Sequence, residues 1–118
     1  MLCYRTAFVL ALPLYGLLIA YLSLSSTGNG PGLVPPWDKV AHASAYGVFA
    51  VIALGAAGNW RRYVALCVGI VFYGIALEIA QSALAARDMS MADAAMNALG
   101  VVLVALVARQ RFRALETN

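Results

Sequence analysis

Charged residues are scarce in this chain. They make up 11% of its 118 residues, whereas hydrophobic residues make up 64%, and charged residues reach about a quarter of an ordinary soluble domain. A soluble domain of this size would need many more polar side chains to cover its surface. The scarcity of charge therefore excludes that class and indicates a membrane protein.

Cysteine is also scarce, and the basic residues form no cluster that is typical of nucleic-acid binding. Cys3 and Cys67 stand in no CxxC or Cys/His spacing, which excludes a disulfide framework and a zinc-finger site. The net charge of +3 is small, and no basic run with interleaved aromatic residues is present. We expect no nucleic-acid partner, no metal and no cofactor.

Long apolar segments are abundant instead. The first, residues 7–24, has no charged residue, and at about 1.5 Å per residue it is just long enough to cross a hydrocarbon core of roughly 30 Å. The segments expected to span the membrane are residues 7–24, 38–58, 63–84 and 92–108. We therefore predict an all-α, integral membrane four-helix bundle that forms a single domain over residues 1–118.

The remaining residues predict a loop, a solvated tail and a site of close helix packing. Residues 23–36 are rich in Ser, Gly and Pro, which predicts a loop. The tail from Arg109 to Asn118 follows the fourth span and is expected to be a solvated end. Gly69 and Gly74 lie in the third span, where the lack of a side chain would let a neighbouring backbone approach closely.

A signal peptide is the alternative interpretation of the first segment, because a basic start precedes an apolar run. The run is long for the apolar part of a signal peptide, and no Ala-x-Ala cleavage site follows it. We expect a retained span, in which neighbouring helices accommodate Pro13.

The basic residues are distributed unevenly between the two sides of this four-span arrangement. Lys39 and Arg87 fall on one side. The other side carries Arg5, Arg61, Arg62, Arg109, Arg111 and Arg113. Because cytoplasmic loops are enriched in Lys and Arg, we expect both termini in the cytoplasm and the first and third loops outside.

Polar residues gather near the expected outer ends of the second and third spans. Asp38, His42 and Tyr46 are spaced by four residues, so they line one face of a helix. Glu78 and Gln81 form a similar pair near the end of the third span. Ionisable residues in a span are costly and are functional candidates by default.

The fourth span begins with a third polar stripe, Asp93, Asn97 and Gly100. If the three stripes converge, they form a polar pocket beneath the outer headgroups. Lys39 and Arg87 would then lie at the rim of the pocket.

Several of these residues also have purely structural interpretations. Ser90 and Asp93 fit a capping box, which would satisfy free backbone donors at a helix start. Asp38 gains from the helix dipole in a similar way, and His42 could be a packed histidine that donates one hydrogen bond.

Glu78 is harder to explain by local structure. It lies about two turns before the expected end of its helix, so it cannot act as an N-cap. We expect it either to pair with Arg87 or Lys39 or to be protonated because it is desolvated.

This ordered set of polar residues resembles the VanZ-like family. The pattern consists of Asp38, Lys39, His42, Tyr46, Glu78, Gln81, Arg87, Asp93, Asn97 and Gly100. It covers about Pro36 to Val107. Members are small helical membrane proteins, and the founding type is associated with teicoplanin resistance. The resemblance implies a multi-pass protein of the bacterial cytoplasmic (inner) membrane. The Lys and Arg distribution predicts that its functional face lies outside.

A binding protein of the cell envelope is the first functional hypothesis. The pocket would bind a membrane lipid or a lipid-linked cell-wall precursor and so affect susceptibility to glycopeptide-type antibiotics. The expected ligand-binding residues are Asp38, Lys39, His42, Tyr46, Glu78, Gln81, Arg87, Asp93 and Asn97. The outer side carries two cations against four carboxyls, which disfavours an anionic ligand unless the carboxyls pair, protonate or bind a metal.

Three alternatives remain open. In a membrane enzyme that modifies an envelope lipid, Asp38 would orient His42 as general base, and Glu78 or Asp93 would be the acid. No serine lies in an obvious nucleophile motif, so we favour binding over catalysis. The same four residues could instead hold a divalent metal, or the polar residues could lock the helices of a structural subunit in a homo- or hetero-oligomeric envelope assembly.

Overall fold

The computed structural model describes residues 2–25, 36–84 and 89–117. In these ranges it contains four helices, namely α1 (Leu2–Ser25), α2 (Trp37–Ala57), α3 (Trp60–Leu84) and α4 (Met91–Glu116). All four described helices are long and apolar enough to cross a membrane. The prediction of an all-α chain with four candidate spans is confirmed, and four candidate spans in the described residues suggest a multi-pass membrane protein.

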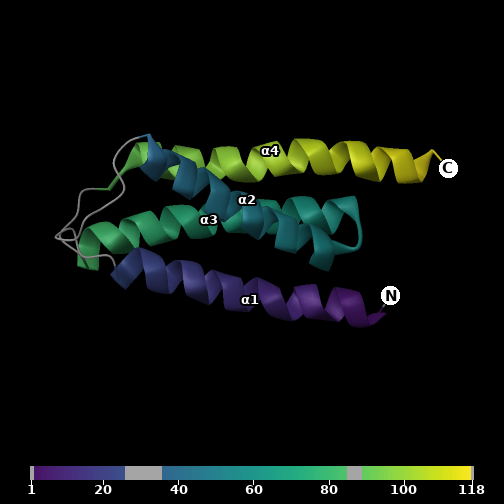
Figure 1. The fold of residues 1–118 in the computed structure, drawn as a ribbon, viewed down its shortest axis with the longest axis horizontal. Coiled ribbons are helices and arrows are strands. Elements are labelled where there is room, and N and C mark those ends of the chain that lie inside the picture. Colours follow the sequence, from purple (N-terminus) through teal and green to yellow (C-terminus); the bar gives the residue numbers. More distant parts are fainter. Residues whose placement is uncertain (1, 26–35, 85–88, 118) are drawn as a thin grey trace.

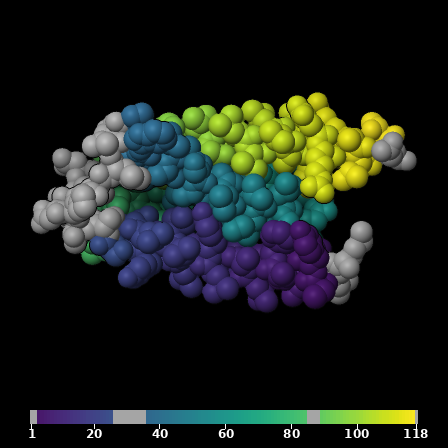
Figure 2. Space-filling model, viewed as in Figure 1, coloured from purple at the N-terminus to yellow at the C-terminus, as the bar shows by residue number. Residues whose placement is uncertain are grey.

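The described helices lie side by side along one long axis, in a body of 53 × 26 × 20 Å (Figure 1). α1 and α3 run in one direction and α2 and α4 in the other. α2 contacts each of the other described helices, and its contact with α4 is the most extensive. Figure 2 shows α1 and α4 along opposite edges with α2 between them. Because α2 and α4 run parallel, their first turns lie at the same end of the bundle.

The core between the helices is made of small and aromatic side chains. Ala50 and Ala53 on α2 have no exposed surface, so the neighbouring helices approach α2 closely. The Phe49 ring packs edge to face against Tyr15 and Tyr73, with centroid distances of 5.2 and 6.0 Å. Such aromatic pairs add about 0.5–1.5 kcal/mol beyond the burial of their area.

The outward surface of the helices is strongly apolar. Leu14, Phe72 and Val107 are 65%, 67% and 70% exposed. In water, each Å² of such surface would cost about 25 cal/mol relative to burial. A hydrocarbon environment removes this cost, which fits the four described helices as candidate spans.

Hydrogen bonds to backbone carbonyls join α1 to α2 and α3. The Tyr15 hydroxyl donates to the carbonyl of Ala45 at 2.8 Å, and the Tyr73 hydroxyl donates to the carbonyl of Gly16 at 2.5 Å. At the start of α1, Arg5 Nε donates to the carbonyl of Ala56 at 3.1 Å. These bonds hold an otherwise lipid-facing helix in register with the bundle.

The two glycines of α3 do not admit a neighbouring backbone as predicted. Gly69 has nothing within 4 Å of the position of a Cβ and borders an open apolar groove of about 540 Å³ between α1 and α3. Gly74 faces a side chain, because a Cβ there would lie 2.9 Å from Cε1 of Tyr46. The close backbone approach occurs on α4 instead, where a Cβ on Gly100 would collide with the carbonyl oxygen of Ala43.

The fourth helix is longer than predicted. The sequence predicts a span that ends at Ala108, but α4 continues to Glu116. No Gly or Pro interrupts this stretch, and Phe112 extends the packing, with its ring centroid 5.7 Å from that of Trp60 and 6.2 Å from that of Tyr63. The tail is therefore a helical extension, on which the side chains of Arg109, Arg111 and Arg113 are exposed.

The connection between α2 and α3 is shorter than predicted. Gly58 ends α2 with a left-handed backbone, φ 73°, a conformation that glycine adopts without strain. The Asn59 side chain accepts a hydrogen bond from the backbone N of Arg62 at 2.9 Å, which caps the start of α3. As a result α3 begins at Trp60 instead of Tyr63.

Candidate functional site

The first turns of α2 supply half of the candidate site. Asp38, His42 and Tyr46 follow one another along one face, as their spacing predicts. Asp38 lies in the first turn, where the helix dipole stabilises a negative charge. Lys39 follows it and reaches across to α4.

The start of α4 supplies the other half. Ser90 is the N-cap residue, and its Oγ accepts a hydrogen bond from the backbone N of Asp93 at 3.1 Å. The predicted cap at Ser90 is therefore confirmed. The Asp93 carboxylate faces α2, where it forms an ion pair with Lys39.

A close crossing of α2 and α4 brings these two turns together. A Cβ on Gly100 would collide with the carbonyl oxygen of Ala43, and a Cβ on Gly47 would lie 3.7 Å from the carbonyl oxygen of Gly100. The small residues let the two backbones approach, as in other membrane helix pairs. Asp93 lies two helical turns before Gly100 on the same face of α4, so its side chain lies next to the first turns of α2.

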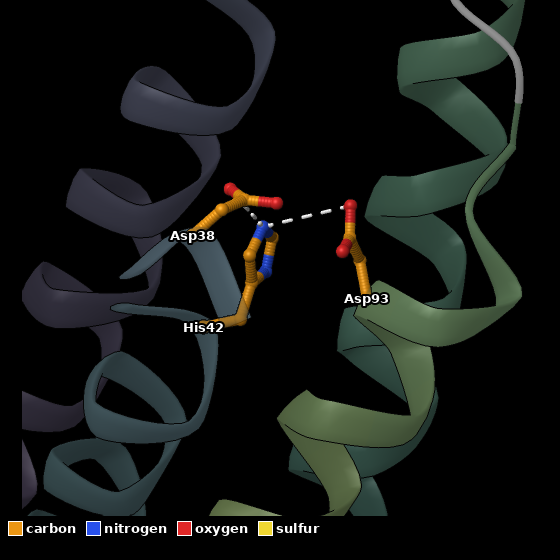
Figure 3. Close-up of side chains that lie close together, drawn as sticks. All are labelled: Asp38, His42 and Asp93. Atoms are coloured by element: carbon orange, nitrogen blue, oxygen red, sulfur yellow. Dashed lines mark ion pairs between the residues drawn. The ribbon is translucent and has the colours of Figure 1, made fainter. Parts of the chain in front are cut away.

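Five polar side chains meet at this point, and we call them the polar cluster: Asp38, Lys39, His42, Asp93 and Asn97. His42 Nε2 lies 3.8 Å from Oδ1 of Asp38 and 3.7 Å from Oδ2 of Asp93 (Figure 3). His42 Nδ1 lies 2.9 Å from Oδ1 of Asn97. Lys39 Nζ contacts Oδ1 of Asp93 and lies 3.4 Å from Oδ2 of Asp38.

Burial differs between the two sides of the polar cluster. Asp93 and Asn97 are buried, at 5% and 3% exposure. The side chains of Asp38, Lys39 and His42 are 25%, 30% and 26% exposed. A buried carboxylate is costly without a partner, and Lys39 supplies one. With a neutral His42, the cluster has two negative charges and one positive charge.

The other predicted site residues on α2 and α3 lie outside this network. The Tyr46 ring packs against Gly74, and Gln81 Nε2 donates to the carbonyl of Ser23 on α1 at 2.5 Å. The polar stripes of α2 and α4 therefore converge as predicted, whereas Gln81 holds α1 in place.

Glu78 is buried in α3, at 5% exposure, and it lies within electrostatic range of the Tyr46 hydroxyl. Arg87, its first predicted partner, lies outside the described residues, as does Asp88. Lys39, the second predicted partner, forms ion pairs with Asp38 and Asp93. The pairing of Glu78 thus stays a prediction.

The sequence interpretation missed Ala43, whose carbonyl forms the close contact with α4. An alanine in an apolar segment has no distinctive signal. The available signal was on the partner helix, where Gly100 follows Asp93 at a helical spacing. Tyr15 and Tyr73, which join α1 to its neighbours, were missed for the same reason, since aromatic residues are common in spans.

The arrangement offers two kinds of chemistry. A histidine between carboxylates can act as a general base or acid. It can also share a metal ion, because Asp38, His42 and Asp93 each offer a ligand atom, and these atoms lie within 4.8 Å of one another. Glu78 is not a member of this group within the described residues.

The resemblance to the VanZ-like family depends on the polar residues themselves. No family model, no curated protein and no solved structure matches the chain. The family therefore stays a prediction.

Proposed function

We propose that the chain is a VanZ-like protein of the bacterial cytoplasmic membrane that binds the polar head of a membrane lipid or of a lipid-linked cell-wall precursor. Binding at the outer face would change what glycopeptide-type antibiotics such as teicoplanin can reach. The supporting observation is the polar cluster, built from the first turns of two neighbouring apolar helices. Ionisable groups in that position are costly, so they are functional candidates by default.

The partial exposure of the polar cluster favours a ligand-binding role. Asp38, Lys39 and His42 are each at least a quarter exposed, whereas Asp93 and Asn97 are buried behind them. A headgroup can reach the exposed side chains while the buried pair holds them in position. Lys39 would donate to phosphate or carboxylate oxygens, and His42 would add a hydrogen bond.

The N-terminal ends of α2 and α4 also favour a negatively charged headgroup. The N-terminal end of a helix carries partial positive charge and free backbone N–H groups, which favour phosphate and carboxylate groups. In the described residues, α2 begins without a side-chain cap. Its first N–H groups can therefore bind headgroup oxygens directly.

The arginines support an outward-facing cluster. The end of α4 carries Arg109, Arg111 and Arg113, and the start of α3 carries Arg61 and Arg62. Both lie at the end of the bundle where α1 begins, opposite the starts of α2 and α4 (Figure 1). The positive-inside rule places the arginine-rich end in the cytoplasm, which leaves the polar cluster outside.

A membrane enzyme is the alternative function. His42 between Asp38 and Asp93 has the surroundings of a general base. The two functions differ in their consequence, because an enzyme leaves a chemically altered lipid in the membrane and a binding protein does not.

Co-purification of lipids tests the binding function. Wild type, Lys39→Met and Arg111→Met would be purified in mild detergent, and the bound lipids identified by mass spectrometry. Both substitutions remove one cation from a helix, but Arg111 is exposed at the opposite end. We expect one envelope lipid class to be enriched with wild type and Arg111→Met and lost with Lys39→Met.

Lys39→Arg is the conservative control, because arginine keeps the positive charge, and it should retain the lipid. Equal bulk phospholipid in all four preparations would refute the binding function. A modified lipid found only in cells with active protein would favour the enzyme.

A further inference from the structure

We propose that the polar cluster binds a divalent metal ion through Oδ1 of Asp38, Nε2 of His42 and Oδ2 of Asp93. Binding of the ion does not require a lipid. Its role as a contact for a lipid headgroup rests on the proposed function. The inference depends on how the polar cluster divides its ligand atoms between Lys39 and His42.

Each carboxylate of the polar cluster uses its two oxygens for different partners. Lys39 pairs with Oδ2 of Asp38 and Oδ1 of Asp93. The other oxygens, Oδ1 of Asp38 and Oδ2 of Asp93, face His42 (Figure 3). Lys39 therefore balances part of the negative charge and leaves one oxygen of each carboxylate for another cation.

In its neutral form, His42 directs a nitrogen lone pair toward these two carboxylate oxygens. Its Nδ1 lies 2.9 Å from the side-chain oxygen of Asn97. An amide oxygen only accepts hydrogen bonds, so Nδ1 donates and, in the neutral ring, Nε2 carries the lone pair. In that neutral form, Nε2 and two carboxylate oxygens converge as acceptors, which is an arrangement that a bound cation stabilises.

The distances fit a metal ion. His42 Nε2 is 3.8 and 3.7 Å from the two carboxylate oxygens. Two ligand atoms that each lie about 2.1 Å from an ion can be at most about 4.2 Å apart. Both observed distances fall within that limit. The ligand atoms of the two carboxylates lie within 4.8 Å of each other, which is at most about 0.6 Å beyond that limit.

The neighbours of the three ligands form a supporting shell. Asn97 fixes the ring orientation of His42. Lys39 holds both carboxylates through the oxygens that do not face His42. Hydrogen-bonded partners of this kind orient metal ligands, and their loss typically reduces metal affinity by about 10–100-fold. Asn97 is 3% exposed, so its amide is held in place by packing.

The ligand set indicates the class of metal. One imidazole with two carboxylates suits Zn²⁺ or Mn²⁺ better than Mg²⁺, which prefers oxygen ligands and retains its waters. Three protein ligands leave coordination positions open for a headgroup oxygen. The ion would also change the formal charge of the polar cluster from −1 to +1, because the cluster has two carboxylates and one lysine. This change removes the charge conflict with an anionic headgroup.

A metal-free ion-pair network is the competing explanation. A protonated His42 together with Lys39 would balance Asp38 and Asp93 without any ion. The two explanations differ in metal binding. The ion-pair network binds no metal, whereas the proposed site binds one ion and needs Asp38 to retain it.

Metal titration of the full chain separates these explanations. The protein would be purified in detergent, stripped with chelator and titrated with Zn²⁺, Mn²⁺ and Mg²⁺, with bound metal counted by elemental analysis. Asp38→Asn removes a ligand at a part-exposed position, and Glu116→Gln removes a carboxylate at the opposite end of the bundle. We expect one Zn²⁺ or Mn²⁺ per chain for wild type and Glu116→Gln, and weak Mg²⁺ binding.

Asp38→Asn should weaken binding by more than about 100-fold, and Asn97→Ala, which removes only the supporting hydrogen bond, by about 10–100-fold. A visible absorption spectrum of bound Co²⁺ should shift in Asn97→Ala if the amide orients the ligand ring. Absence of stoichiometric metal in wild type, or equal affinity in Asp38→Asn and Glu116→Gln, would overturn the site.

Lipid analysis with and without chelator distinguishes this inference from the proposed function. Lipid that is released when the metal is removed supports the ion as the headgroup contact. Lipid retained by a protein that binds no metal overturns the metal site alone. Metal bound by a protein that carries no specific lipid overturns the lipid-binding function alone.

Discussion

Lys39 on α2 forms an ion pair with Asp93 on α4, 54 residues later in the sequence. The pair joins the first turns of two parallel helices and compensates a carboxylate that is 5% exposed. Removing Lys39 takes the paired positive charge away from the buried Asp93 carboxylate, and Asp93→Asn removes one of the two ion pairs of Lys39. We expect Lys39→Met and Asp93→Asn each to lower the thermal stability of the protein in detergent.

The double variant tests whether the two residues act together. If they do, Lys39→Met with Asp93→Asn should be more stable than the sum of the two single losses predicts. Strict additivity would show that the two side chains do not stabilise each other.

Gly100→Ala should separate α2 from α4. The added Cβ would collide with the backbone of Ala43, and overpacking of this kind costs about 1–3 kcal/mol. Thermal unfolding measures the loss. Gly69→Ala is the matched control, because nothing lies within 4 Å of its Cβ position, and it should be neutral or slightly stabilising. A tolerated Gly100→Ala would contradict the close crossing.

Ser90→Ala should destabilise the start of α4. The substitution removes the oxygen that accepts from the backbone N of Asp93, and loss of such a cap typically costs about 1 kcal/mol. Ser90→Asp should restore the stability, because aspartate also caps helices. Ser82→Ala removes a part-exposed hydroxyl that donates to the carbonyl of Ile79 in its own helix and should change stability little. Equal stability of Ser90→Ala and wild type would argue against the cap.

Thiol labelling should place the polar cluster outside the cell. In a background with Cys3 and Cys67 replaced by serine, Met89→Cys lies just before α4 and is exposed. A membrane-impermeant thiol reagent should label it in intact cells, whereas Thr117→Cys at the other end should react only after the membrane is opened. The reverse pattern would invert the orientation and place the site in the cytoplasm.

His42→Ala and Glu78→Gln should abolish any effect of the protein on teicoplanin susceptibility while the protein still accumulates in the membrane. His42 contacts both carboxylates of the polar cluster, and Glu78 is buried near Tyr46. Growth in teicoplanin and membrane immunoblots are the two measurements, with Arg111→Met as the control. Loss of both variants from the membrane would instead favour a structural role.

The sequence determined the spans and the face on which the polar residues lie. Hydropathy and helical spacing are local properties of the chain, so the four described helices and the stripe from Asp38 to Tyr46 follow from them. Ser90 was recognised as a cap for the same reason. The helix ends were less predictable, because α4 continues beyond its apolar run through the packing of Phe112 against Trp60.

The tertiary structure decided which polar residues meet. Gln81 bonds α1 at Ser23, and Gly100 marks the close crossing in place of Gly69. Lys39 and His42 take different oxygens of the same carboxylates. These relationships depend on the rotation and height of each helix relative to its neighbours. Contacts between helices far apart in the sequence set that geometry, so no local pattern in the chain records it.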